Sequence, residues 1–177
     1  MDGRLKMSRI HSHCSYCGAK FEDGAGWPRT CASCSNTSFL NPVPVTVVQI
    51  PVGPGLLVIR RAIEPRKGLL ALPGGYVNFG ETWQEAGARE VFEETGVVLN
   101  PEEIREFAIR SGEDGTIILF GISQPVPPDR IPPFTPNREC LERKILTEWE
   151  PLAFKLHEEM IEAYFGTRPE GRYLSGK

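Results

Sequence analysis

Apolar and polar positions change their period along the chain, and these changes predict where strands and helices lie. From Val43 the chain is rich in β-branched residues, and Leu56–Ile59 is a second, uninterrupted apolar run. Both patterns are typical of strands, with a turn expected between them at Pro51–Gly55. A third apolar run, Ile117–Phe120, follows a glycine-containing turn at Ser111–Gly115 and predicts another strand.

Two segments predict helices instead. Thr82 and Glu85 have the spacing of a capping box, so a helix is expected to begin at Thr82 and to end before Gly96, which can adopt a left-handed conformation. Near the C-terminus, apolar residues recur every four positions between Leu152 and Tyr164, which predicts an amphipathic helix. Strands mixed with helices from residue 41 onward indicate an α/β domain.

Composition limits the classes of partner. The chain has 177 residues, of which 40% are hydrophobic and 24% charged, and this suits one globular domain with a small appendage. A net charge of −3 disfavours a nucleic-acid partner but leaves that alternative open. Its apolar stretches are shorter than the roughly 20 residues that cross a bilayer, and the first ten residues lack the apolar region of a secretion signal. We therefore expect a cytoplasmic protein with no membrane partner.

The charge is unevenly distributed. Between Glu81 and Glu106 there are eight glutamates and two arginines, a net charge of −6. Residues 1–40 hold five basic and three acidic side chains, a net charge of +2. This contrast predicts two units, with boundaries at 1–40 and 41–177.

Four of the five cysteines lie in the first unit, as Cys14-x2-Cys17 and Cys31-x2-Cys34. Two such pairs suit a tetrahedral Zn²⁺, and the few apolar residues between them could not form a core without a metal. Two disulfides or four reduced thiols are the alternatives, and a reducing compartment disfavours disulfides. We expect a structural zinc ribbon over residues 1–40, which could also bind nucleic acid, while Cys140 is expected to be inert.

The predicted helix at residues 82–95 carries an acidic cluster. Glu90, Glu93 and Glu94 stand at positions i, i+3 and i+4, so their carboxylates project from one face. Like charges at this spacing oppose helix formation, and a bound Mg²⁺ or Mn²⁺ would compensate them. Arg89, one turn before Glu93, can pair with that carboxylate. A solvated acidic face is the simpler interpretation of these residues taken alone.

The surrounding residues favour the metal site. They read Gly75-x5-Glu81-x7-Arg89-Glu90-Val91-x-Glu93-Glu94-x-Gly96-Val97. At every defined position this segment resembles the 23-residue signature of the Nudix hydrolase family. The resemblance implies an α/β fold, the Nudix α/β/α sandwich around a mixed sheet, for residues 41–177, preceded by the zinc ribbon.

The resemblance also implies an activity, which is the metal-dependent hydrolysis of the pyrophosphate in a nucleoside diphosphate linked to another group. It implies that Glu90, Glu93 and Glu94 hold Mg²⁺ or Mn²⁺, with the carbonyl of Gly74 as a further ligand. Glu81 would support the site.

Within that family the general base comes from the signature or from a later loop. We expect Glu93 to be the base, with Arg89 orienting the helix carboxylates, and the later candidates are Glu113 and Glu139.

Two regions outside the signature are candidates for substrate contact. Arg60 and Arg61 end a predicted strand beside it, and they either hold phosphate or are ordinary surface charges. The segment Gln124–Asn137 holds six prolines and is expected to be a stiff, extended loop. It could be a substrate lid, a contact in a homodimer or a plain connector.

A zinc ribbon before a Nudix domain resembles two subgroups, the NADH pyrophosphatases and a group associated with ADP-ribose and FAD. Ser123-Gln124-Pro125 matches the start of a motif of the first group, but Val126 replaces its tryptophan. The second group fits better, so ADP-ribose or FAD is the expected small-molecule substrate. NADH or a nucleoside triphosphate is the alternative substrate, and a non-catalytic module that binds nucleotides or nucleic acid is the alternative class.

Overall fold

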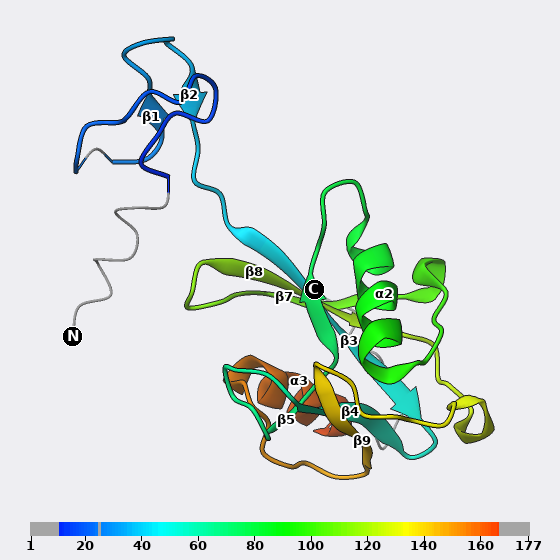
Figure 1. Cartoon of the computed structure of the whole chain (residues 1–177). Coiled ribbons are helices and arrows are strands. Elements are labelled where there is room, and N and C mark those ends of the chain that lie inside the picture. Colours follow the sequence, from blue (N-terminus) through cyan, green and yellow to red (C-terminus); the bar gives the residue numbers. More distant parts are fainter. Residues whose placement is uncertain (1–10, 25, 167–177) are drawn as a thin grey trace. The chain divides into compact units, whose positions relative to one another are not determined.

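The computed structural model describes residues 11–24 and 26–166 (Figure 1). The chain divides into two compact units, Met1–Pro42 and Val43–Lys177. The first contains a two-stranded antiparallel sheet of β1 (Arg29–Thr30) and β2 (Thr37–Ser38). No helix among the described residues is long and apolar enough to span a bilayer.

The second unit is built on a mixed sheet. Its strands are β3 (Val43–Val52), β4 (Gly55–Arg61), β5 (Leu70–Ala71), β6 (Gly74–Tyr76), β7 (Arg105–Ser111), β8 (Thr116–Ile122) and β9 (Cys140–Leu146). The main path runs β5-β4-β3-β8-β7, with β6 paired to β3 and β9 paired to β4. Strands β3 and β8 are parallel, and the other pairs are antiparallel. Short 3₁₀ helices, η1 (Pro101–Glu103) and η2 (Pro128–Arg130), lie in the connections.

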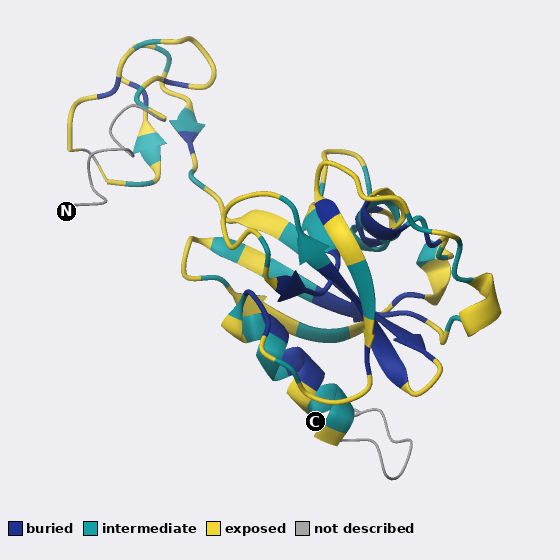
Figure 2. Ribbon diagram, turned by 60° about the horizontal axis from the view of Figure 1, so that its bottom comes forward, coloured by how far each residue is buried: buried dark blue, intermediate teal, exposed yellow. Residues whose placement is uncertain are grey.

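One helix packs on each face of this sheet. Along β3, Val48 packs in a core cluster with Val91 of α2 (Trp83–Thr95), whereas Val47 packs in a second cluster with Met160 of α3 (Lys155–Gly166). Side chains alternate between the faces of a strand, so the two clusters lie on opposite sides of the sheet. The buried strands at the centre of the unit are visible in Figure 2. The predicted α/β/α sandwich with a mixed sheet is confirmed.

Helix α2 has the ends that its sequence predicts. Thr82 is the N-cap, its hydroxyl accepts from the Glu85 N–H, and the Glu85 carboxylate accepts from the Thr82 N–H, which completes the capping box. Gly96 ends the helix with φ 73°. Inside the helix, a Cβ at Gly87 would lie 2.8 Å from Val48 Cγ2, so the absence of a side chain lets α2 approach β3 closely.

The sheet differs from the prediction in several places, since β5, β6 and β7 were not predicted as strands, and two further differences concern β4 and β9. The turn between β3 and β4 is shorter than Pro51–Gly55, because Val52 pairs directly with Gly55 and leaves a two-residue connection. Strand β9 was not anticipated, because its centre is charged. Cys140 and Leu146 at its two ends are buried, and the strand is held by its pairing with distant β4.

Candidate functional site

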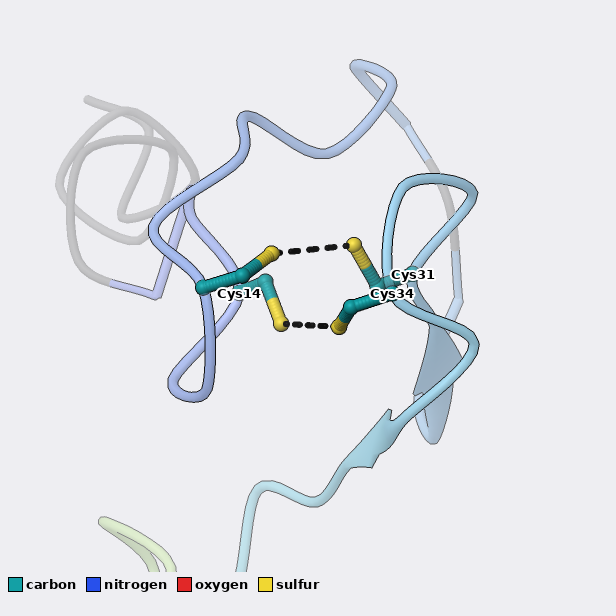
Figure 3. A group of neighbouring side chains, drawn as sticks. Cys14, Cys31 and Cys34 are labelled. Carbon is teal, nitrogen blue, oxygen red and sulfur yellow. Dashed lines mark hydrogen bonds between the residues drawn. The ribbon is translucent and has the colours of Figure 1, made fainter.

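The four cysteines of the first unit form a metal-binding geometry (Figure 3). Their ligand atoms all lie within 4.8 Å of one another, and no disulfide joins them. Cys14 Sγ lies 3.7 Å from Cys34 Sγ, and Cys17 Sγ lies 3.6 Å from Cys31 Sγ. Around a Zn²⁺ with Zn–S bonds of about 2.3 Å, the sulfurs of a tetrahedron lie about 3.8 Å apart. The donor set and its spacing therefore fit Zn²⁺.

Each cysteine pair sits on a tight knuckle. The Gly18 N–H donates to the Cys14 carbonyl, and the Ser35 N–H donates to the Cys31 carbonyl, each at 2.9 Å. Gly18 has φ 74° as expected, and Ser35 adopts the same left-handed region at φ 59°. Hydrogen bonds from the backbone N–H groups of Cys17 and Tyr16 lower the pKa of Cys14 to about 6. Cys14 thus favours the thiolate, which is the form that binds a metal, whereas the neighbouring cysteine side chains and burial raise the pKa of Cys17.

In the second unit, the guanidinium of Arg89 organises the acidic residues of the signature. It donates to both carboxylate oxygens of Glu81, at 3.1 and 2.8 Å. Its Nη1 donates to Glu90 at 2.8 Å and to Glu93 at 3.4 Å, and its Nη2 donates to the Tyr76 carbonyl at 3.0 Å. These hydrogen bonds lower the pKa of Glu81 to about 2. Arg89 therefore ties the loop before α2 to the acidic face of the helix.

The other carboxylates of this face differ in burial. The Glu94 side chain is 5% exposed and accepts a 2.9 Å hydrogen bond from the Gly74 N–H. Burial raises the pKa of Glu94 to about 8, and the charges of Glu90 and Glu139 add to the effect. Burial also raises the pKa of Glu90. By contrast, the side chain of Glu93 is 51% exposed, so it is the helix carboxylate most open to an incoming molecule.

Gly75 makes room for one of these groups. A Cβ at Gly75 would lie 2.4 Å from the Glu90 carboxylate, so that carboxylate occupies the place of the missing side chain. On the neighbouring strand, Thr46 is the register partner of Gly75, and its buried Oγ1 has no hydrogen-bond partner among the described residues. The Glu90 carboxylate is therefore packed closely between α2 and the β3–β6 pair.

The donor set of α2 fits a divalent cation. It consists of carboxylate oxygens, the ligands that Mg²⁺ and Mn²⁺ prefer. Two of the three carboxylates have raised pKa values, so an added positive charge would stabilise their ionised forms. Within residues 11–24 and 26–166, these oxygens do not gather as closely as the cysteine sulfurs, and Arg89 pairs with Glu90 and Glu93.

The two predicted phosphate-binding arginines have different surroundings. Arg60 Nε lies 3.0 Å from the Glu142 carboxylate, and its Nη1 donates to the Gly68 carbonyl, so this side chain braces β4 against its neighbours. Arg61 stacks over the Phe154 ring at 5.2 Å and donates to the Pro65 carbonyl. The positive charge of Arg61 acts to lower the pKa of both Glu94 and His157, and its side chain contacts Phe154 and Pro65.

The later candidates for the general base lie in different places. Glu113 is in the turn between β7 and β8. Glu139 directly precedes β9, where its carbonyl accepts from the Ala62 N–H at 2.8 Å, and its charge acts on Glu90 and Glu94. Asn137 donates to the Glu93 carbonyl and accepts from the Glu139 N–H, so the backbone of Glu139 lies near the end of the acidic helix.

The proline-rich segment lines a cavity of about 480 Å³ together with residues 96–100 and Glu103. None of the carboxylates of the signature lines this cavity. Two side chains near the segment were not anticipated from the sequence, Asn137 and Arg143, which donate to the carbonyls of Glu93 and Thr95. No local pattern marks either residue, because each acts on a helix more than 40 residues away along the chain.

Curated relatives match part of the chain. NAD-capped RNA hydrolase NudC of Edwardsiella ictaluri is 35% identical over 86 residues, which cover 48% of this chain and 33% of that protein. The protein of the same name from Shigella flexneri is 32% identical over 90 residues, covering 50% and 35%. The chain thus spans about a third of the length of these relatives.

Solved structures match a larger part of the chain. A NUDIX hydrolase from Nitrosomonas europaea aligns with a TM-score of 0.75 and 26% identity, covering 91% of this chain and 94% of that one. A bifunctional NMN adenylyltransferase/ADP ribose pyrophosphatase from Francisella tularensis aligns with a TM-score of 0.53 and 25% identity, covering 62% and 35%. The family profile of the NUDIX domain matches residues 41–164. The chain therefore belongs to the Nudix hydrolase family.

Proposed function

We propose that the protein hydrolyses the pyrophosphate bond of a nucleoside diphosphate linked to another group, with Mg²⁺ or Mn²⁺ as cofactor. The observation that carries the proposal is the contact network of Arg89. It holds the carboxylates of Glu81, Glu90 and Glu93 at one face of α2, next to the buried carboxylate of Glu94. A non-catalytic module would not need so many acidic side chains at one place.

Glu90, Glu93 and Glu94 would hold the divalent ions, with the Gly74 carbonyl as a further ligand. A bound ion would neutralise part of the negative charge of the pyrophosphate and would lower the pKa of a bound water. The chain positions its ligands on rigid elements, because Gly74 and Gly75 belong to β6 and the three carboxylates to α2. Glu81 keeps Arg89 in place, and Arg89 orients the helix carboxylates.

We assign the general base to Glu93. Of the three predicted metal ligands on α2 it has the largest exposure, so it can reach a water that attacks phosphorus. Arg61 is our first candidate for a phosphate contact, because its Nε donates to the uncharged Pro65 carbonyl and not to a carboxylate. Arg60 is the weaker candidate, since its guanidinium is held by Glu142 and the Gly68 carbonyl.

For the substrate we propose an adenosine diphosphate derivative. ADP-ribose and FAD follow from the ribbon and element order, and the names of the matched proteins specify NAD-capped RNA and ADP ribose. All three compounds contain an adenosine that is joined to another group through a pyrophosphate. NADH and nucleoside triphosphates are the alternative substrates.

We also propose that residues 1–40 form a domain with a structural Zn²⁺ and that residues 41–177 form the Nudix domain. Four sulfur ligands close the coordination sphere, which leaves this zinc no open position for catalysis. Free thiols at all four positions suit a reducing compartment such as the cytoplasm.

A substrate screen tests the proposal. The full chain with Mg²⁺ or Mn²⁺ is incubated with ADP-ribose, FAD, NADH, NAD-capped RNA and nucleoside triphosphates, and the products are separated by chromatography. Turnover of an adenosine diphosphate derivative, abolished by EDTA and restored by metal, is expected. Nanomolar binding of nucleic acid without any turnover would favour the binding module instead.

The assignment of the base is tested by E93Q. Because general-base catalysis contributes about 10²–10⁴-fold, kcat should fall by at least about 10²-fold. The matched control is E102Q, the same change at an exposed residue of η1 outside the site. If E93Q retains near-normal turnover while E139Q loses it, the base is Glu139.

A further inference from the structure

The last turn of α2 is held by side chains from a distant part of the chain. A helix leaves its final carbonyls without partners inside the helix, and α2 has no basic residue in its last turn. The Glu93 carbonyl accepts from Asn137 Nδ2 at 2.9 Å, and the Thr95 carbonyl accepts from Arg143 Nη1. We call these two side chains the α2 clasp.

Asn137 also shapes the segment that carries Glu139. Its Oδ1 accepts from the Glu139 N–H at 2.9 Å and from the Cys140 N–H at 2.8 Å. Its own N–H donates to the Cys140 carbonyl at 2.9 Å. One amide group therefore joins the backbone of Glu93, a predicted metal ligand and base, to the backbone of Glu139.

Arg143, the second side chain of the α2 clasp, also contacts the proline-rich segment. Its second guanidinium nitrogen, Nη2, donates to the Pro132 carbonyl, and the guanidinium stacks over the Phe134 ring at 4.9 Å. The same side chain thus binds both the end of α2 and the proline-rich segment. A positive charge at a helix C-terminus is also favourable for the helix dipole.

We propose that Asn137 is a positioning residue that fixes Glu139 against the acidic helix, so that Glu139 acts together with the carboxylates of α2. Arg143 holds the proline-rich segment in the position that this contact requires. The inference rests on the proposed hydrolase function and extends it to residues outside the signature. Asn137 itself touches no reacting atom in this scheme.

The variant N137D separates this role from that of a simple turn residue. An aspartate keeps the side-chain acceptor for the N–H groups of Glu139 and Cys140, so the turn is retained. Its side chain has no N–H to donate to the Glu93 carbonyl. The control is N100D, where the same change adds the same charge at the N-cap of η1 and preserves its hydrogen bond to Glu102. N137S, with a side chain too short to bridge both backbones, serves as a second variant if N137D unfolds.

The kinetic result expected for N137D is a fall in kcat of about tenfold with KM changed by less than twofold, while N100D resembles the wild type. E139Q is also expected to lower kcat. The double variant N137D/E139Q should be no slower than E139Q alone, because Asn137 acts through Glu139. Normal kcat in N137D, a change confined to KM, or losses that multiply in the double variant would overturn the proposal.

Mn²⁺ binding by the full chain, followed through water-proton relaxation without substrate, provides a measure independent of turnover. N137D is expected to bind Mn²⁺ several-fold more weakly than N100D, and equal affinities would overturn the clasp proposal. A wild type that binds Mn²⁺ but hydrolyses none of the compounds in the screen would overturn the hydrolase proposal alone.

Discussion

At the scale of single residues, the acidic site depends on where side chains are missing as much as on where they are present. Arg89 gathers Glu81, Glu90 and Glu93, but the Glu90 carboxylate can take its place only because Gly75 has no Cβ. The glycine of the signature is therefore a space requirement here, since Gly75 does not have a positive φ.

The substitution G75A tests this requirement. The new methyl group would displace the flexible end of Glu90, so the Tm should change little while Mn²⁺ affinity and kcat each fall by about tenfold. Isothermal titration with Mn²⁺ and a thermal melt measure the two quantities. The control is G26A, since a Cβ there meets nothing within 4 Å. Unchanged Mn²⁺ affinity in G75A would show that Glu90 is not a ligand.

The buried side chain of His157 makes the stability of the protein depend on pH. His157 is buried, its Nδ1 accepts from the Leu72 N–H at 3.2 Å, and its ring packs against Phe120 and Phe154. Burial, with a contribution from the charge of Arg61, lowers the pKa of His157 to about 3. The folded protein therefore keeps this side chain neutral in a range where the unfolded chain takes up a proton.

The sign of the effect follows from proton binding. Between an unfolded pKa of about 6.5 and a folded pKa of about 3, the unfolded state binds more protons, so stability is full above pH 6.5 and falls as the pH is lowered. H157N keeps an acceptor for Leu72 and does not titrate. The free energy of unfolding, measured with urea between pH 7 and 4.5, should fall less steeply with decreasing pH in H157N than in the wild type. The difference in slope should be up to about 1.4 kcal/mol per pH unit. Parallel pH profiles for the two proteins would contradict the assignment.

At the scale of elements, the position of α2 on the sheet depends on Gly87. G87A would raise helix propensity by about 1 kcal/mol, but its Cβ would lie 2.8 Å from Val48 Cγ2 and 3.1 Å from Thr46 Oγ1. Overpacking of this kind costs about 1–3 kcal/mol, so we expect a net loss of stability of about 1 kcal/mol in urea titrations. G166A, at the end of α3 where a Cβ meets nothing within 4 Å, should be close to neutral. A stabilised G87A would mean that α2 can move away from β3.

The elements also show how far local sequence predicts this fold. The ends of α2 follow from Thr82, Glu85 and Gly96, which act within the helix itself, and both were predicted. Strand β9 was missed because its neighbour is β4, far away in sequence, and its charged centre has no alternating apolar pattern. The signature indicated the acidic helix in full, whereas Asn137 could not be found, since its role depends on the Glu93 carbonyl across the fold.

At the scale of the whole molecule, the two units should respond differently to loss of metal. The first unit has a small buried cluster of Cys14, Phe21 and Cys31, whereas the second has three clusters of its own. We therefore expect a zinc-specific chelator, or the variant C17S, to disorder residues 11–42 while residues 43–166 stay folded. C140S is the matched control and should retain one zinc per chain.

Two-dimensional NMR and metal analysis by mass spectrometry measure this response. The expected result is collapse of the amide signals of the first unit into the unfolded region, with the signals of β3–β9 unchanged. Loss of the signals of the second unit as well would show that its folding requires the ribbon. A full set of ribbon signals without metal would contradict the structural role of zinc.

The pairing of β4 with β9 has a consequence for how the protein is made. The ribosome completes β4 at Arg61 and begins β9 at Cys140, about 80 residues later. At roughly 5–20 residues per second, the nascent chain waits about 4–16 s for that partner. During this interval the edge of β4 that pairs with β9 has no partner strand, although Leu56–Ile59 are fully buried in the finished fold. The growing chain therefore passes through a stage in which this apolar strand is open to other nascent chains, and the synthesis of β9 closes it.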